Sequence, residues 1–424
     1  MKRYVVFNTK NLSSPINIGK VENQNLHGMT EVPTMLIVTH ANFLETAQDF
    51  ANYKTEEKGI LTKVVTVDQV YNEFSSGAQD ITAIRDMAKM LYDRSANFKF
   101  LLLFGDASYD YKNRIKENTN YVPTYQAYES MNDIKTYTSD DYFGFLEDTE
   151  GTWSESGQNH TLDIGVGRFP IQTIEQATGI INKIKNYHNK ELYGNWKNEI
   201  TFVADDGDDN LHMKDANSLA SDINQNFSEY NANKIYLDAF VQTSSAQGET
   251  SKTASEEINR QLDRGTFIVN YTGHGGEIGW TQEQILTVPQ INSWTNKQLP
   301  LFVTATCEFG RYDDPVRISG AEYTLINPNG GAIAIISTTR PVYASSNKQL
   351  NDQFYKAVFL PNKDGSMPTL GEVMISTKNN SLNGVYNRNF SLLGDPSLTL
   401  AYPQETVKIT HLNKQATVCL LYTS

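Results

Sequence analysis

From Pro33 onward, short apolar runs alternate with longer segments in which apolar residues recur at helical spacing. Several of the runs are apolar throughout, as expected of strands that are covered on both faces. Strands are predicted at 35–39, 61–67, 99–104, 163–167, 200–204, 266–272, 300–306 and 331–337. Helices are predicted at 41–58, 80–94, 171–189, 212–227, 251–264, 319–327, 345–359 and 369–382. This alternation indicates βαβ units, so we expect an α/β fold with a mostly parallel sheet flanked by helices.

The two ends and two internal stretches interrupt this pattern. Residues 1–30 hold one strand-like run and then polar loop, which we interpret as the end of an upstream β-rich domain or a linker. The closing CLLYTS resembles a translated sequencing adapter, so we expect a gene fragment in which 404–424 begins a following segment; the alternative is an edge strand at 416–422. A break near 190–198 separates two halves. The polar segment 106–160 is too long for an ordinary connection, and we interpret it as a functional or metal-held insertion.

Composition and charge narrow the class of protein. The 424 residues are 39% hydrophobic, with 23 tyrosines and 19 phenylalanines, which is a globular composition. The net charge of −13 argues against nucleic acid as a partner. No apolar stretch approaches the length of a transmembrane segment, and the first ten residues lack the apolar core of a signal peptide. The two cysteines, Cys307 and Cys419, exclude a disulfide framework, and Cys419 receives no function because it lies in the fragmentary tail.

The strongest candidate chemistry follows two successive predicted strands. Strand 266–272 leads into His274 between glycines, and strand 300–306 leads into Cys307. Parallel strands deliver their carboxyl ends to one edge of a sheet, so we expect these two side chains to lie together there. A nearby imidazole shifts a thiol toward the nucleophilic thiolate. Glycines let backbone approach a substrate closely, which makes the N–H groups of Gly275 and Cys307 candidates for an oxyanion hole.

Each of these residues also has a plainer interpretation. A cysteine at a strand end is more often a small core residue. A histidine in a glycine-rich turn is more often structural. Their joint placement after two buried strands favours catalysis by Cys307 and His274. A zinc site is the rival chemistry, but it needs two or three further ligands with local spacing, and the sequence indicates none near these residues.

The segments around the two candidates resemble the gingipain family of cysteine peptidases, over roughly residues 33–403. The matching segments are 270–275 (NYTGHG) with Glu277 and Trp280, 299–307 (LPLFVTATC), 331–336 (GAIAII), 394–398 (GDPSL), 105–106 (GD) and 164–169 (IGVGRF). The resemblance implies a caspase-like (caspase/gingipain) α/β fold in two subdomains, residues 31–195 and 196–403, each with a mostly parallel sheet flanked by helices.

The resemblance also implies a Cys–His dyad with an acidic residue that orients the histidine. In gingipains this acid follows the first strand of the second subdomain, and the matching segment here is 203–207 (VADDG). Asp206 is the first choice and Asp205 the second. Such an acid would hold the imidazole tautomer and stabilise the imidazolium. The dense acids of 205–209 are equally consistent with a solvated turn or a cation-binding loop.

Two further positions bear on the substrate pocket. Arginine-specific gingipains place an acid in the pocket a few residues after the orienting acid, whereas the matching stretch here contains Leu211 and His212, with Asp209 close by. The resemblance therefore does not carry arginine specificity to this chain, and His212 becomes a candidate pocket residue. An aromatic pocket wall of the family matches Tyr343, which is also consistent with an ordinary surface aromatic.

Structural calcium is a further implication of the resemblance, because gingipain-like domains bind calcium. Carboxylates are the hard oxygen ligands that calcium prefers. No EF-hand spacing is present, and solvated turns explain the same acids as well. The dyad itself requires no cofactor. The candidate ligands lie in one long polar segment and are Asp106, Asp110, Asp140 and Asp141.

Within the family, several segments resemble the type IX secretion sortases more than the secreted gingipains: 71–77 (YNEFSSG), 105–110 (GDASYD), 140–144 (DDYFG) and 307–315 (CEFGRYDDP). This resemblance implies a cysteine endopeptidase and transpeptidase at the cell surface or outer membrane. Its partners would be secreted cargo with C-terminal sorting domains, lipopolysaccharide as the anchor, and other secretion-system proteins. The alternatives are a secreted gingipain-like general endopeptidase and a non-catalytic gingipain-like binding scaffold.

Overall fold

The computed structural model describes residues 4–17, 19–129, 131–150, 160–246, 248–382 and 384–404. The expectations for Cys419, for an edge strand at 416–422 and for the closing CLLYTS lie outside these residues. None of the described helices combines the length and the apolar character that crossing a membrane requires.

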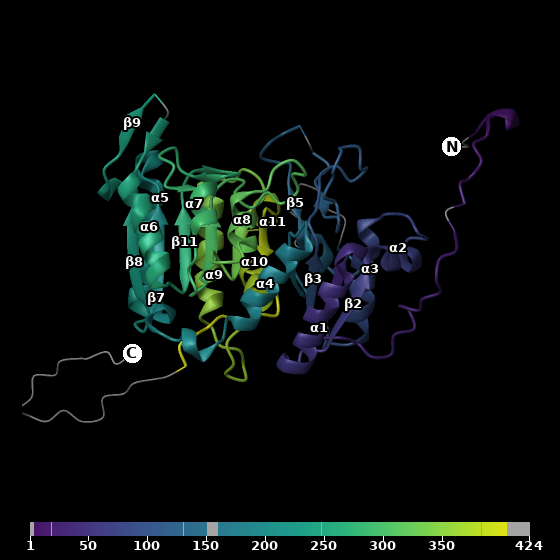
Figure 1. The fold of residues 1–424 in the computed structure, drawn as a ribbon, viewed down its shortest axis with the longest axis horizontal. Coiled ribbons are helices and arrows are strands. Elements are labelled where there is room, and N and C mark those ends of the chain that lie inside the picture. Colours follow the sequence, from purple (N-terminus) through teal and green to yellow (C-terminus); the bar gives the residue numbers. More distant parts are fainter. Residues whose placement is uncertain are drawn as a thin grey trace, which may run out of the picture.

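Among the described residues, one ten-stranded sheet runs through the molecule and joins the two predicted halves (Figure 1). Its strands are β1 (Met35–Thr39), β2 (Thr62–Thr66), β3 (Phe100–Phe104), β6 (Gly165–Phe169), β7 (Glu199–Ala204), β8 (Asn231–Tyr236), β11 (Ile268–Thr272), β15 (Leu301–Ala305), β16 (Ala334–Thr338) and β17 (Phe390–Leu393). Their order across the sheet is β2-β1-β3-β6-β17-β16-β15-β11-β7-β8.

The two halves of the sheet meet at β17. The neighbours β2, β1, β3 and β6 are parallel, as are β16, β15, β11, β7 and β8. β17 pairs antiparallel with β16, and its Leu393 bridges to Arg168 of β6. The predicted α/β fold with a mostly parallel sheet is therefore confirmed. The sheets of the two expected subdomains are continuous, while the subdomain boundaries at 31–195 and 196–403 stay a prediction.

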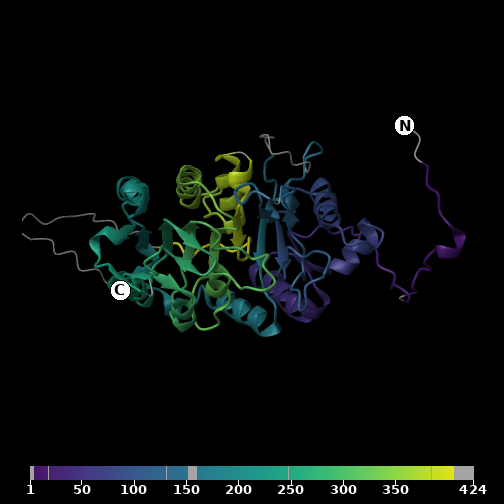
Figure 2. The same ribbon diagram turned by 90° about the horizontal axis from the view of Figure 1, so that it is seen from above.

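Helices cover both faces of this sheet (Figure 2). They are α1 (Leu44–Lys58), α2 (Val67–Phe74), α3 (Ile81–Arg94), α4 (Ile174–Asn186), α5 (Gly207–Asn226), α6 (Lys252–Arg264), α7 (Val288–Ser293), α8 (Gly320–Ile326), α9 (Ala344–Val358), α10 (Leu370–Asn379) and α11 (Val385–Arg388). On one face, α1 contacts α4, α4 contacts α8 and α8 contacts α7; on the other, α5 contacts α9 and α9 contacts α10. The central strands are therefore covered on both sides.

The amino-acid pattern explains both kinds of element. Every residue of β1, β3, β11 and β15 is buried, which accounts for their continuous apolar character. Capping boxes at Thr173, Ser319 and Thr369 satisfy free backbone N–H groups where α4, α8 and α10 begin. The remaining short elements are β4 (Tyr125–Gln126), β5 (Thr138–Ser139), β9 (Thr243–Ser245), β10 (Gly248–Thr250), β12 (Gly275–Gly276), β13 (Gly279–Trp280) and β14 (Leu286–Thr287), with the 3-10 helices η1 (Thr9–Asn11), η2 (Ala41–Phe43), η3 (Asp140–Gly144), η4 (Lys190–Leu192), η5 (Asn195–Asn198) and η6 (Leu237–Ala239).

Buried ion pairs anchor the predicted insertion, 106–160, to the sheet. Arg168 of β6 donates to both carboxylate oxygens of Asp140, at 2.7 and 2.8 Å, and is itself fully buried. Lys378 of α10 pairs with Asp141, which is also buried. A buried charge requires such a partner because its desolvation is costly. In the described part of the insertion, the protein's own cations therefore take the anchoring role that the sequence suggested for a metal.

Candidate active site

His274 and Cys307 follow neighbouring strands of the sheet. β11 and β15 are parallel partners, and their register pairs Thr272 with Ala305. Each candidate lies two residues beyond this pair, so both leave the sheet at the same edge and at the same level. This is the placement that the sequence pattern predicts, and it is the edge at which parallel sheets hold their ligands.

The loops that carry the two residues are in contact. The Gly273 N–H donates to the carbonyl oxygen of Ala305 at 3.5 Å. Gly275 lies so close to the next strand's end that a Cβ on it would be 2.5 Å from Thr306 Oγ1. Glycine at 275 thus allows the backbone after His274 to approach the residue before Cys307. The oxyanion role of the Gly275 and Cys307 N–H groups stays a prediction.

Cys307 is partly buried, and its Sγ lies 3.8 Å from the carbonyl oxygen of Val342. Burial raises the pKa of the Cys307 thiol, and the nearby Glu308 carboxylate raises it further. Without an added base the thiol is therefore protonated at neutral pH, and a base must take its proton before it can act as a nucleophile.

The predicted pocket residue Tyr343 follows Val342 directly, is about half exposed and packs edge-on against Tyr386.

His274 has a fixed backbone and an exposed ring. Its N–H donates to Asp205 Oδ2 at 3.0 Å, and its carbonyl oxygen accepts a hydrogen bond from the Tyr271 hydroxyl. The side chain is 53% exposed, and its Nε2 lies 3.2 Å from Asp208 Oδ2. The ring is thus presented to solvent from a rigid loop and contacts one carboxylate.

The acids that follow β7 have separate roles. Asp205 is buried, and its carboxylate holds the His274 loop by accepting the His274 backbone N–H. Asp206, the sequence-based choice for the orienting acid, accepts a hydrogen bond from Gln242 Nε2 at 2.6 Å. The carboxylate that contacts the His274 ring belongs to Asp208, which the sequence reasoning did not single out. Residues 208–210 adopt left-handed φ values of 53°, 54° and 61°, and this turn sets the direction of Asp208.

His212 lies beside the candidate base and is buried. Its ring centroid is 5.0 Å from that of His274, with the planes nearly perpendicular, and its Nε2 is 3.4 Å from Asp208 Oδ2. Neither of its ring nitrogens has a hydrogen-bond partner. Burial lowers the pKa of His212, and the neighbouring His274 lowers it further, so the ring is neutral at pH 7. Whether His212 contacts substrate stays a prediction.

One expectation about metal ligands was wrong. The sequence indicated no further ligand near His274 and Cys307, yet the ligand atoms of Asp208, His212 and His274 all lie within 4.8 Å of one another. In the part of the chain that the structure describes, this is the one such group of three or more histidine, cysteine or carboxylate side chains. Local spacing concealed it because the histidines belong to different elements, 62 positions apart in the numbering (274 minus 212).

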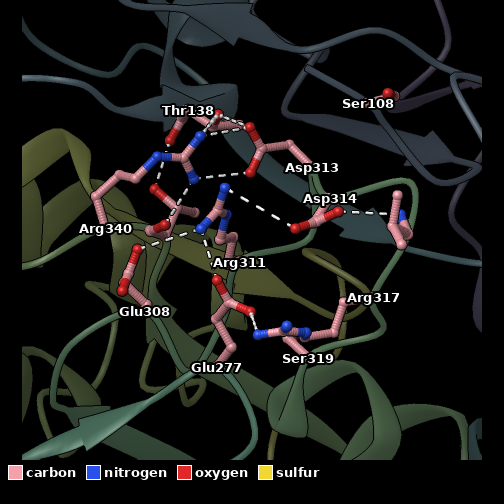
Figure 3. A network of polar contacts seen from close by, with 12 residues as sticks. Ser108, Thr138, Glu277, Glu308, Arg311, Asp313, Asp314, Arg317, Ser319 and Arg340 are labelled. Carbon is pink, nitrogen blue, oxygen red and sulfur yellow. Dashed lines mark hydrogen bonds and ion pairs between the residues drawn. The ribbon is translucent and has the colours of Figure 1, made fainter. Parts of the chain in front are cut away.

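A network of charged side chains ties the His274 loop to the segment after Cys307 (Figure 3). Glu277, three residues after His274, accepts from Arg311 at 2.6 Å and also pairs with Arg317. Arg311 lies 3.5 Å from Glu308, the residue after Cys307. Glu308 has a φ of 54°, a left-handed value that is strained for a residue with a side chain. These contacts hold the two loops together.

A buried ion pair supports the same segment, which follows Cys307. Arg340 donates to both carboxylate oxygens of Asp313, at 2.7 and 2.5 Å, and the Thr138 hydroxyl donates to Asp313 at 2.6 Å (Figure 3). Burial alone would raise the pKa of Asp313, but Arg340, with Thr138 and Gln126, holds it at about 2. The pair thus joins the segment after β15, the segment after β16 and the β5 strand of the insertion.

Replacing Asp313 by Asn is expected to lower the free energy of unfolding by about 3 kcal/mol, because it leaves the Arg340 charge buried without a counter-charge. The native pKa of about 2 lies below the ordinary value of 3.8, so the carboxylate contributes stability above pH 4 and loses it as the pH falls toward 2. Denaturant unfolding at pH 7 and pH 3 measures both effects. Asp314→Asn is the control, since the ion pair of Asp314 with Arg311 is long, at 3.9 Å, and an amide oxygen can still accept the Val316 N–H that Asp314 accepts at 3.0 Å. Equal stability of the two variants would contradict the assigned role of the pair.

Two surface hollows flank the candidate residues. One, of about 990 Å³, adjoins the loop after His274; its lining includes Gly276, Ile278, Trp280, Val316, Ile318 and Tyr323. The other, of about 1090 Å³, adjoins the segment after Cys307; its lining includes Tyr109, Tyr111, Tyr128, Glu308, Arg311 and Arg340. The first is mainly apolar and the second is aromatic and charged, so an extended chain crossing the site would meet different chemistry on its two sides.

Among the described residues, the four acids expected to bind calcium do not form a cluster of three or more potential ligands. Asp140 and Asp141 are neutralised by Arg168 and Lys378, and Asp110 accepts hydrogen bonds from backbone N–H groups in its own loop. Asp106 is different: it is fully buried, its Oδ1 has no hydrogen-bond partner, and burial raises its pKa to about 7. The donors therefore do not fit a single calcium site made of all four residues, and calcium binding elsewhere stays a prediction.

Comparisons with known proteins place this arrangement in context. The profile of Peptidase family C25 matches residues 29–401. Among curated proteins, Gingipain R2 of Porphyromonas gingivalis is 21% identical over 318 residues, covering 72% of this chain and 36% of Gingipain R2. The chain thus spans about a third of the length of this curated relative.

Two solved structures resemble the fold. The Arg-specific cysteine proteinase gingipain R superposes with a TM-score of 0.65 at 18% identity, over 87% of this chain and 78% of that chain. Dimeric latent PorU from Porphyromonas gingivalis superposes with a TM-score of 0.50 at 25% identity, over 93% of this chain and 32% of that chain. The first similarity supports the predicted fold, and the second covers nearly all of this chain.

Proposed function

The chain belongs to peptidase family C25, a family of cysteine peptidases, and on that premise we propose that Cys307 is its nucleophile and His274 its general base. The observation that carries this proposal is the register of β11 and β15, which sets both residues two positions beyond the paired Thr272 and Ala305. Cys307 is the single cysteine of the described residues.

The proposed reaction proceeds through a thioester. His274 accepts the thiol proton, the Cys307 sulfur bonds to the carbonyl carbon of the scissile peptide, and the N–H groups of Gly275 and Cys307 hold the oxyanion. His274 then donates the proton to the leaving amine as the C–N bond breaks. Water or an amine attacks the thioester next, giving hydrolysis or transpeptidation and restoring the thiol. Asp208 is the candidate for orienting the His274 ring, in place of Asp206.

The proposed substrates are secreted proteins that carry C-terminal sorting domains. The similarity to PorU supports this choice, because it is higher in sequence identity than that to gingipain R and extends over 93% of this chain. We extend the proposal to attachment of the cleaved cargo to a lipopolysaccharide amine at the cell surface, with other secretion-system proteins as partners. A secreted general endopeptidase is the second candidate, favoured by the similarity to Gingipain R2.

Labelling with a peptidyl acyloxymethyl ketone, which reacts with activated cysteines, tests the dyad directly. Wild-type protein is expected to be labelled at one site, Cys307→Ala not at all, and His274→Ala at a rate lower by at least about 100-fold, since the general base contributes this much. Intact-mass spectrometry measures the extent. Cys419→Ala is the matched control and is expected to label like the wild type. Equal labelling of wild type and Cys307→Ala would overturn the nucleophile assignment, and an unchanged rate in His274→Ala would overturn the dyad.

A further inference from the structure

The histidine proposed as general base shares a carboxylate with a second, buried histidine. Asp208 Oδ2 lies 3.2 Å from His274 Nε2 and 3.4 Å from His212 Nε2. The three ligand atoms come from two separate segments, the start of α5 and the loop after β11. They converge on one point although the two histidines belong to different elements.

The separations of these atoms match those around a tetrahedral zinc ion. Zinc–nitrogen and zinc–oxygen bonds of about 2.0–2.1 Å at tetrahedral angles place neighbouring ligand atoms about 3.3 Å apart. Two of the three separations, 3.2 and 3.4 Å, already have this value, and all three lie within 4.8 Å. The third separation joins the two histidines, and because the His274 side chain is about half exposed, a small rotation of its ring can shorten it.

An independent observation points to a ligand at this position. His212 is 5% exposed, and neither of its ring nitrogens has a hydrogen-bond partner. A buried imidazole left without a partner costs roughly 1–3 kcal/mol. Its Nε2 lies 3.4 Å from Asp208 Oδ2 with no hydrogen bond between them, and a cation bound between these two atoms would satisfy both. A purely structural core histidine would be expected to have a hydrogen-bond partner within the protein.

The donor set selects the class of ion. Two imidazole nitrogens and one carboxylate oxygen suit zinc and the neighbouring transition metals, whereas calcium and magnesium prefer oxygen donors throughout. Three protein ligands would leave a fourth position of a tetrahedron for water or another ligand.

We propose that Asp208, His212 and His274 form a binding site for a divalent transition-metal ion, with zinc the ion that fits best, and that an ion bound there withdraws His274 from proton transfer. An ion bonded to Nε2 occupies that nitrogen's electron pair and its positive charge makes the other nitrogen less basic. The effect on catalysis rests on the proposed role of His274 as general base; the metal site itself does not.

Direct binding tests the site in the Cys307→Ala protein, which removes the thiol as an alternative zinc ligand. Cobalt(II) serves as a spectroscopic probe, because its visible absorption reports nitrogen and oxygen coordination, and zinc is titrated in competition. One equivalent is expected to bind. Added His212→Gln or Asp208→Asn is expected to weaken zinc binding at least tenfold, since even the loss of a residue that only supports a ligand costs 10–100-fold.

His27→Gln in the same protein is the matched control, because exposed His27 also contacts a carboxylate, that of Glu73 at 2.8 Å, and should have no effect on zinc affinity. Thermal unfolding monitors the fold of each variant; Asp208 is half exposed, so Asp208→Asn remains informative if the buried His212 change destabilises the protein. No binding at micromolar zinc would overturn the site, and so would an affinity unchanged by Asp208→Asn.

The consequence for catalysis is measured on protein with Cys307 intact. Zinc is expected to slow probe labelling of Cys307, a chelator to restore it, and Asp208→Asn to raise the inhibitory zinc concentration at least tenfold. An inhibitory concentration unchanged in Asp208→Asn would show that zinc acts on the thiol and would overturn this part of the proposal. If the wild type shows no peptidase reactivity at all, the proposed function fails, while the binding experiment still decides the metal site.

Discussion

Cys307→Ala is expected to reduce cleavage of a secreted cargo protein by on the order of 10⁴–10⁶ in kcat. The covalent thioester cannot form without the sulfur, and loss of a nucleophile in such a catalytic unit has an effect of this size. His274→Ala is expected to fall into the same range. Because the two residues act in one step, the double variant should be no slower than either single variant by more than a few-fold.

The measurement uses cargo with its C-terminal sorting domain and the same cargo without it, with released fragments quantified by mass spectrometry. Cys419→Ala is the control and is expected to retain wild-type rates. Cleavage of both cargo forms at similar rates would favour the general endopeptidase over the sortase. Activity of Cys307→Ala within tenfold of the wild type would contradict the proposed mechanism, whichever substrate is correct.

The strands that the sequence predicts best are those whose residues are apolar throughout. β1 at Met35–Thr39 matches the predicted 35–39, and β15 at Leu301–Ala305 lies within the predicted 300–306, because each is buried on both faces and reads as one apolar run. β8 at Asn231–Tyr236 was missed because this edge strand is mostly polar, NANKIY, with one fully buried residue, Ile235. An edge strand can be polar because only one of its sides is paired.

A local capping signal explains another difference. The predicted strand 61–67 ends one residue early, at Thr66, and the unpredicted helix α2 begins at Val67. Thr66 and Gln69 form a capping box, with the Thr66 side chain accepting from the Gln69 N–H. The T-x-x-Q spacing that marks such a start is present in the sequence, within a run that reads equally well as a strand.

The candidate site, like the fold, has a part that the sequence predicts and a part that it does not. Strand order alone brings His274 and Cys307 to one edge of the sheet, so the sequence sufficed to predict the edge at which both residues lie. The direction of Asp208 depends on three consecutive left-handed residues, 208–210, which no residue type in that stretch requires. The partners of Asp140 and Asp141 are 28 and 237 residues distant along the chain, beyond the reach of local patterns.

Asp208→Asn is expected to lower kcat by about 10²–10⁴, more than the corresponding change at Asp206 or Asp205. An acid that orients a catalytic imidazole contributes about this much, because it fixes the tautomer and stabilises the imidazolium. Asp208 contacts the His274 ring at 3.2 Å, whereas Asp206 is bound to Gln242. Steady-state kinetics on the same cargo separates kcat from KM, and the KM of Asp208→Asn should change by less than about threefold.

Asp206→Asn is the matched control, since it makes the same chemical change two residues away and should keep kcat within about threefold of the wild type. Asp205→Asn is expected to fall between them, because the amide oxygen can still accept the His274 N–H while the charge is lost. Asp208→Glu should recover part of the activity if the carboxylate acts by contact with the ring. A larger loss at Asp206 than at Asp208 would return the orienting role to the residue that the family resemblance implied.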